Sequence, residues 1–150
     1  MRRDIEFNAD GVTLRGWFYT PDTGKGPFAC VVMAHGFSGT KEMTLDKFAE
    51  VFSAAGLSVL VYDNRCLGAS GGEPRSEIDP TWQRRDYRTA ISYAQTLPEV
   101  DPKRIGIWGT SYTGGTVCAV AAIDRRVKAV VSQVPFMRGH YNLQQFLPIT

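Results

Sequence analysis

Residues 104–115 read RIGIWGTSYTGG and place a serine, Ser111, between two apolar stretches. The first stretch is rich in β-forming residues and ends at Gly109, and residues 116–123 are apolar and compatible with a helix. This order predicts a strand, a sharp turn that carries the serine, and a helix, which together make a nucleophile elbow. Such a turn exposes the hydroxyl, and the first amides of the helix are free to face a developing negative charge.

The stretch departs from the common Gly-x-Ser-x-Gly pattern at one position. Gly109 and Ser111 match the pattern, but Thr113 stands where the last glycine is usual, and two glycines follow it. A β-branched residue crowds a tight turn, and we expect the two glycines to relieve that crowding. The alternative is a loop that caps an ordinary helix, with Ser111 or Thr110 as the N-cap residue.

The rest of the chain alternates between strand and helix patterns. Residues 4–8 and 12–19 alternate apolar and polar positions around Asp10-Gly11, which predicts a hairpin. Buried strands are then predicted at 28–34, 57–62, 104–109 and 127–134, and helices at 44–55, 82–97 and 112–123. Such alternation is typical of an α/β domain, a mostly parallel sheet with helices on both faces.

Three polar residues follow predicted strands at the edge where such sheets bind ligands. His35, Asp63 and Ser111 each come just after a strand, and ligands bind outside the carboxyl ends of parallel strands. The chain contains no internal repeat and no linker, so we expect residues 1–150 to form a single domain.

Composition excludes several classes of partner. The net charge of +2 leaves no electrostatic footprint for nucleic acid, and the longest apolar runs are too short to cross a bilayer. Cys30, Cys66 and Cys118 form neither a metal-binding spacing nor an even disulfide set. We therefore expect no nucleic acid, no membrane, no cofactor and no metal, and a location in the reducing cytoplasm.

Four segments together resemble the N-terminal half of an α/β-hydrolase. They are the hairpin, HGFSG at 35–39, VYDNRCLGASGG at 61–72 and GTSYTGG at 109–115. Within that superfamily the chain is similar to fungal polyketide transferases and related thiohydrolases, and its elbow is similar to that of X-prolyl peptidase-type serine hydrolases. The resemblance covers nearly the whole chain, and its motifs are specific for the superfamily rather than for a substrate.

The resemblance implies a role for three residues. Ser111 would be the nucleophile, and the backbone N–H groups of Phe37 and Tyr112 would form the oxyanion hole. The implied chemistry is acyl transfer from the ester, thioester or amide carbonyl of a small-molecule substrate, through an acyl-serine intermediate. Whether water or an alcohol accepts the acyl group is left open.

Two nearby groups have alternative interpretations. His35 is either a catalytic base or a structural histidine that bonds loop backbone, and we favour the structural interpretation. Asp63 and Arg65 either meet the substrate or form internal ion pairs, and we favour the ion pairs, because structural charge networks are easily mistaken for functional ones.

The catalytic triad is incomplete in this sequence. A serine needs a histidine to take its proton and an acid to orient that histidine, and in this fold both follow the serine. After Ser111 the only candidates are Asp124 and His140. Asp124 lies at the far end of the predicted helix, about 20 Å from the elbow at 1.5 Å per residue.

We therefore expect this chain to be the N-terminal portion of a longer hydrolase, or to be completed by a second chain or by self-association. The strand at 127–134 would otherwise leave an open sheet edge, which favours aggregation. The alternative is a non-catalytic module of the same fold that binds a ligand or partner. A nucleotide-binding domain is disfavoured, because Gly-x-Gly-x-x-Gly does not follow the first strand-to-helix turn.

Overall fold

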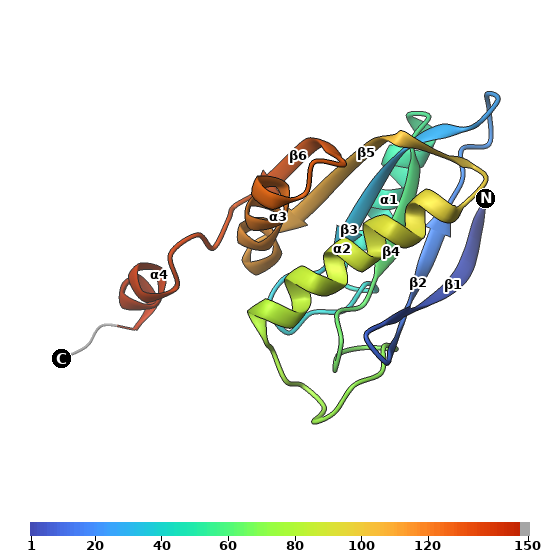
Figure 1. Cartoon of the computed structure of the whole chain (residues 1–150). Coiled ribbons are helices and arrows are strands. Elements are labelled where there is room, and N and C mark those ends of the chain that lie inside the picture. Colours follow the sequence, from blue (N-terminus) through green and yellow to red (C-terminus); the bar gives the residue numbers. More distant parts are fainter. Residues whose placement is uncertain (148–150) are drawn as a thin grey trace.

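The computed structural model describes residues 1–147, which form a six-stranded sheet flanked by helices (Figure 1). The strands are β1 (Arg2–Ala9), β2 (Val12–Tyr19), β3 (Phe28–Ala34), β4 (Ser58–Tyr62), β5 (Val100–Thr110) and β6 (Val127–Gln133). The helices are α1 (Leu45–Ala54), α2 (Pro80–Thr96), α3 (Tyr112–Ile123) and α4 (Gly139–Phe146).

The strands lie in the order β1-β2-β4-β3-β5-β6. Strand β3 pairs in parallel with β4 and β5, and β5 pairs in parallel with β6, whereas β2 is antiparallel to β1 and β4. The expected mostly parallel sheet with an N-terminal antiparallel hairpin is therefore confirmed. Asp10 and Gly11 form the hairpin turn with φ of 50° and 83°, the positive values that a type I′ turn requires.

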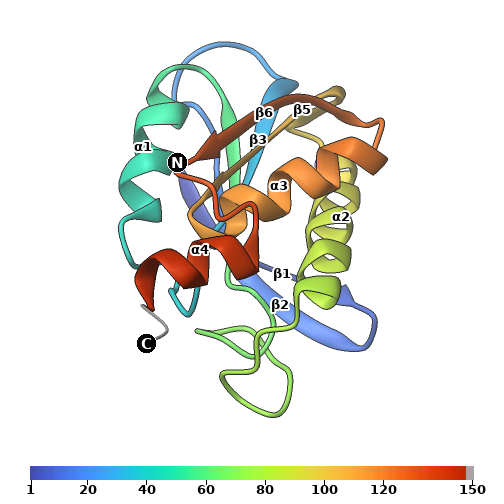
Figure 2. The ribbon, with the colours of Figure 1, turned by 90° about the vertical axis from the view of Figure 1, so that its left-hand side faces the viewer.

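Helices cover both faces of the sheet, as the alternating pattern predicts (Figure 2). Helices α2 and α3 pack on one face, where Tyr87, Ile91 and Val117 join one apolar cluster. Helix α1 packs on the other face, where Leu45 and Ala49 join a second cluster. The central strands are thus buried on both sides, which explains their nearly continuous apolar sequence.

Three elements differ most from the sequence-based expectation. Strand β5 begins at Val100 rather than at residue 104. Helix α2 begins at Pro80 rather than at residue 82, because the Asp79 side chain accepts hydrogen bonds from the Thr81 and Trp82 amides at 2.7 and 3.0 Å. Helix α4 was not predicted, and it projects beyond β6 away from the sheet (Figure 1). Within residues 1–147, no helix combines the length and apolar character that crossing a bilayer requires.

Candidate active site

Ser111 lies between the end of β5 and the start of α3, in a strained backbone conformation. Its φ of 55° and ψ of −118° are rarely adopted by residues with a side chain. The residue is exposed, and its side chain makes no capping hydrogen bond to the helix. This geometry matches a nucleophile elbow and does not match the alternative of a serine that caps an ordinary helix.

Backbone hydrogen bonds with the last residue of β6 and with the segment after it hold the elbow in place. The Ser111 amide donates to the Gln133 carbonyl at 2.9 Å, and the Phe136 amide donates to the Ser111 carbonyl at 2.8 Å. The turn that carries the serine is therefore fixed on both sides by one neighbouring segment.

Glycines allow this close packing. A Cβ on Gly109 would overlap the Thr113 carbonyl oxygen and lie 2.6 Å from its carbonyl carbon. A Cβ on Gly114 would lie 2.9 Å from the Gln133 carbonyl oxygen, and one on Gly115 would overlap the carbonyl oxygen of Phe136. Because Gly114 and Gly115 have no side chain, the backbone of residues 133–136 can pack directly against the first turn of α3.

The unexpected threonine of the motif has a structural role of its own. Thr113 is buried, and its hydroxyl donates a hydrogen bond to the His35 carbonyl oxygen. This bond ties the first turn of α3 to the turn that follows β3. The motif alone did not reveal it, because the partner lies 78 residues away in the sequence.

The turn after β3 passes directly against the elbow. A Cβ on Gly36 would lie 3.4 Å from the Ser111 Cβ, and the rings of Phe37 and Tyr112 meet edge to face with centroids 5.7 Å apart. Among residues 1–147, neither the Phe37 amide nor the Tyr112 amide donates a hydrogen bond. The three predicted site residues are thus brought together, and their chemical roles stay predictions.

Both ring nitrogens of His35 form hydrogen bonds within the protein. Its Nε2 accepts a hydrogen bond from the Asn64 amide at 3.0 Å, so Nδ1 carries the proton that bonds the Gly36 carbonyl at 2.9 Å. Burial lowers the pKa of His35, and the Gly36 carbonyl and the Asp63 carboxylate oppose that effect. The geometry agrees with a neutral, structural histidine that shapes the turn.

The charged groups near the turn pair with one another. Asp63 is fully buried, and its carboxylate accepts hydrogen bonds from the Lys41 ammonium and from the Lys41 backbone amide, both at 2.7 Å. Arg65 donates to the Asp86 carboxylate at 2.6 Å through Nε. Because Asp63 and Arg65 each have an internal partner, and neither lines the cavity beside Ser111, the arrangement agrees with the ion-pair interpretation.

Lowering the pH below about 6.5, the usual histidine value, is expected to destabilise the fold through His35. Because burial depresses its folded-state pKa, the unfolded chain binds a proton there that the folded chain does not. The free energy of unfolding should therefore fall as the pH drops, which urea titrations between about pH 8 and 5.5 would measure.

Two variants separate this effect from other titrations. The His35→Gln variant should lose most of the pH dependence, whereas His140→Gln, which removes the exposed histidine of α4, should keep it. A wild-type free energy that does not change over this range would contradict the assignment.

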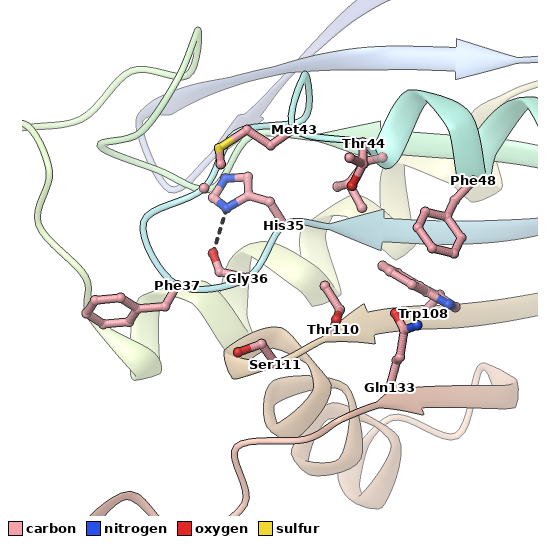
Figure 3. A pocket seen from close by; sticks show the side chains of 12 residues that line it. His35, Gly36, Phe37, Met43, Thr44, Phe48, Trp108, Thr110, Ser111 and Gln133 are labelled. Atoms are coloured by element: carbon pink, nitrogen blue, oxygen red, sulfur yellow. Dashed lines mark hydrogen bonds between the residues drawn. The ribbon is translucent and has the colours of Figure 1, made fainter. Parts of the chain in front are cut away.

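A cavity of about 320 Å³ opens beside Ser111 (Figure 3). It extends from the turn after β3 to the aromatic rings of Phe48 and Trp108, whose centroids are 5.0 Å apart. Sequence reasoning did not identify these two rings as part of the site, because they come from α1 and β5 and only the fold places them side by side. The cavity is lined by His35, Gly36, Phe37, Gly39, Met43, Thr44, Leu45, Phe48, Trp108, Thr110, Ser111 and Gln133.

Neither downstream candidate for the triad reaches this cavity. Asp124 lies at the end of α3 and binds Arg126 at 2.6 Å, and this hydrogen bond is the main reason that its pKa is lowered to about 2. His140 lies exposed on α4. The described residues therefore place neither the acid nor the histidine beside Ser111.

Comparison with known proteins identifies the family. The profile of the X-Pro dipeptidyl-peptidase (S15) family matches residues 10–144. The chain belongs to this family. It is 44% identical over 147 residues to the quorum-quenching protein AidA of Acinetobacter baumannii, and this match covers 98% of this chain and 48% of that protein. It is 40% identical over 139 residues to the thiohydrolase aneE of Aspergillus aculeatus, covering 92% of this chain and 43% of that protein.

A solved structure shows the same architecture. The crystal structure of the α/β hydrolase GrgF from Penicillium sp. sh18 superposes with a TM-score of 0.85 at 38% identity, covering 90% of this chain and 46% of that chain. The resemblance to the N-terminal half of an α/β-hydrolase is therefore confirmed. The S15 chain spans about half the length of the relatives that it matches.

Proposed function

We propose that this S15-family chain carries the nucleophile and oxyanion hole of a serine hydrolase or acyltransferase. The observation that supports it best is the strained, exposed Ser111, packed against a turn whose Phe37 amide donates no hydrogen bond within the described residues. The hydroxyl would attack an ester, thioester or amide carbonyl and give its proton to the histidine of the triad, which would pass that proton to the departing alcohol, thiol or amine. The resulting acyl-serine would then transfer its acyl group to water or to an alcohol, which restores the free hydroxyl.

The Phe37 and Tyr112 amides would stabilise the tetrahedral intermediate. Two backbone N–H groups that point at the developing oxyanion lower the barrier most when the fold already holds them in place before the reaction. Removal of one such donor typically lowers kcat by about 100–1,000-fold. Preorganisation here comes from the His35 and Thr113 bonds on one side and from the backbone of Gln133 and Phe136 on the other.

The acid and the histidine would come from outside the described residues. Strand β6 lies at the end of the sheet order, and its Val130 and Val131 are 40% and 52% exposed. Since the matched relatives are about twice as long, we propose that continuing chain covers this edge and completes the triad. A second copy or a separate chain that covers the edge is the alternative arrangement.

The names of the relatives favour catalysis over a non-catalytic binding module. One is a thiohydrolase and another an α/β hydrolase, which supports a small-molecule acyl thioester or ester as the substrate of this chain. The three cysteines are free, which supports a reducing compartment such as the cytoplasm.

A fluorophosphonate probe tests the nucleophile directly in the intact protein. We expect the probe to label Ser111, and Ser111→Ala to abolish labelling. The matched control is Ser92→Ala, which removes a serine hydroxyl from helix α2 and should keep labelling. An unlabelled wild-type protein, under conditions that label a known serine hydrolase, would overturn the proposed function.

A further inference from the structure

We propose that the cavity between α1 and the ends of β5 and β6 binds the acyl part of the substrate, and that it selects an uncharged acyl group with an apolar or aromatic end. The proposal rests on the proposed function, because it takes Ser111 as the atom to which the acyl group becomes attached. To the proposed function it adds the class of acyl group that binds and the residues that determine this specificity.

The position of the cavity assigns it to the acyl group. One end is lined by Ser111 and by the Gly36–Phe37 turn, and the other end by Phe48 and Trp108 (Figure 3). A carbonyl held at the first end would direct its acyl chain into the second. The volume of about 320 Å³ lies at the lower end of the range for small-molecule sites, which favours a compact group over a long chain.

The far end of the cavity is mostly aromatic. Trp108 is only 3% exposed, and its ring packs against Phe48 with an interplanar angle of 39°. Leu45 also lines the cavity and belongs, with Trp108, to the core cluster beneath α1. Because the core fixes these side chains, they offer a preformed surface to an apolar or planar group.

Charge narrows the class of substrate further. Within the described chain, the cavity is lined without any Asp, Glu, Lys or Arg side chain, and the His35 ring is neutral as its two hydrogen bonds require. The nearby Lys41 and Asp63 are paired with each other. A carboxylate or ammonium on the acyl group would therefore lose water without gaining a partner, which is strongly unfavourable.

Three uncharged polar side chains interrupt the apolar lining of the cavity, and Figure 3 shows Gln133 beside Trp108. Thr44, Thr110 and Gln133 line the cavity, and Thr44 precedes α1 without using its hydroxyl to cap that helix. These groups can bond a neutral hydroxyl or keto oxygen along the acyl chain. The site therefore fits an apolar acyl group that carries such neutral substituents.

Esters that share one leaving group test this selection in the intact protein. The p-nitrophenyl esters of acetate, phenylacetate and succinate share one leaving group, so their kcat/KM values, each divided by the rate of that ester's uncatalysed cleavage, report the binding of the acyl group in the transition state. We expect phenylacetate to exceed acetate by about tenfold, and the anionic succinate to be the poorest of the three.

Three variants test whether this cavity determines the specificity for the acyl group. Phe48→Ala should lower the ratio of phenylacetate to acetate about tenfold. Phe52→Ala removes the same side chain from the same helix but outside the cavity, so it should leave that ratio within about twofold. Met43→Lys, at a residue that is 63% exposed, should raise the ratio of succinate to phenylacetate about tenfold by giving the carboxylate a partner.

Failure of this proposal can be told apart from failure of the proposed function. If the probe labels Ser111 but Phe48→Ala and Phe52→Ala shift the ester ratio equally, the acyl site is overturned and the nucleophile stands. Equal kcat/KM values for acetate and phenylacetate in a protein that is labelled at Ser111 lead to the same conclusion. Thermal unfolding of each variant shows whether it is folded when it is assayed.

Discussion

Replacement of Ser111 by alanine is expected to lower kcat by about 10⁶-fold, the loss typical of removing the nucleophile from a complete triad. The fold should survive, because the side chain is exposed and makes no hydrogen bond to the rest of residues 1–147. Steady-state kinetics on a p-nitrophenyl ester, together with the free energy of unfolding, measures both effects. A variant that keeps a tenth of the wild-type rate would show that the nucleophile lies elsewhere.

Replacement of the same residue by glycine tests the strain of the elbow without reference to chemistry. Ser111 and an alanine in its place both hold a Cβ at a φ of 55°, whereas glycine adopts this region freely. Ser111→Gly should therefore be more stable than Ser111→Ala by about 1 kcal/mol. At Ser92, inside helix α2, the order should reverse by about the same amount, because glycine weakens a helix interior.

The regular elements could be predicted because their signals are local. Gly109 and Ser111 indicated the elbow, Asp10-Gly11 indicated the hairpin turn, and the alternation of patterns indicated the layers. The start of α2 also has a local signal, since Asp79 followed by Pro80 is a typical helix start.

The parts that could not be predicted depend on residues far apart in the sequence. The threonine in the elbow is explained only by its bond to the His35 carbonyl, and the sequence offers no local reason for it. Likewise, Phe48 and Trp108 lie within the helix predicted at 44–55 and the strand predicted at 104–109, and only the fold places both rings at the end of one cavity. Within residues 1–147, helix α4 packs little against the sheet, so packing did not favour a strong apolar pattern there.

Gly115→Ala is expected to destabilise the protein by about 3 kcal/mol, the upper end of the usual cost of overpacking. Two effects compete, because alanine favours a helix interior over glycine by about 1 kcal/mol. The contact should dominate: the added Cβ would overlap the Phe136 carbonyl oxygen, which is backbone and has no rotamer by which to move away. Displacing this segment would also weaken the hydrogen bond from the Phe136 amide to the Ser111 carbonyl, so the esterase rate should fall with stability.

Gly106→Ala is the matched control for this prediction. Gly106 lies in the middle of β5, where an added Cβ would be 3.5 Å from the Ala129 carbonyl oxygen, an ordinary contact distance. Its free energy of unfolding should stay within about 1 kcal/mol of wild type, and its esterase rate should be nearly unchanged. Urea unfolding of the two variants decides between the competing effects at Gly115. If Gly115→Ala proves more stable than wild type, helix propensity outweighs the contact with the Phe136 carbonyl oxygen, and the segment after β6 does not pack tightly against the elbow.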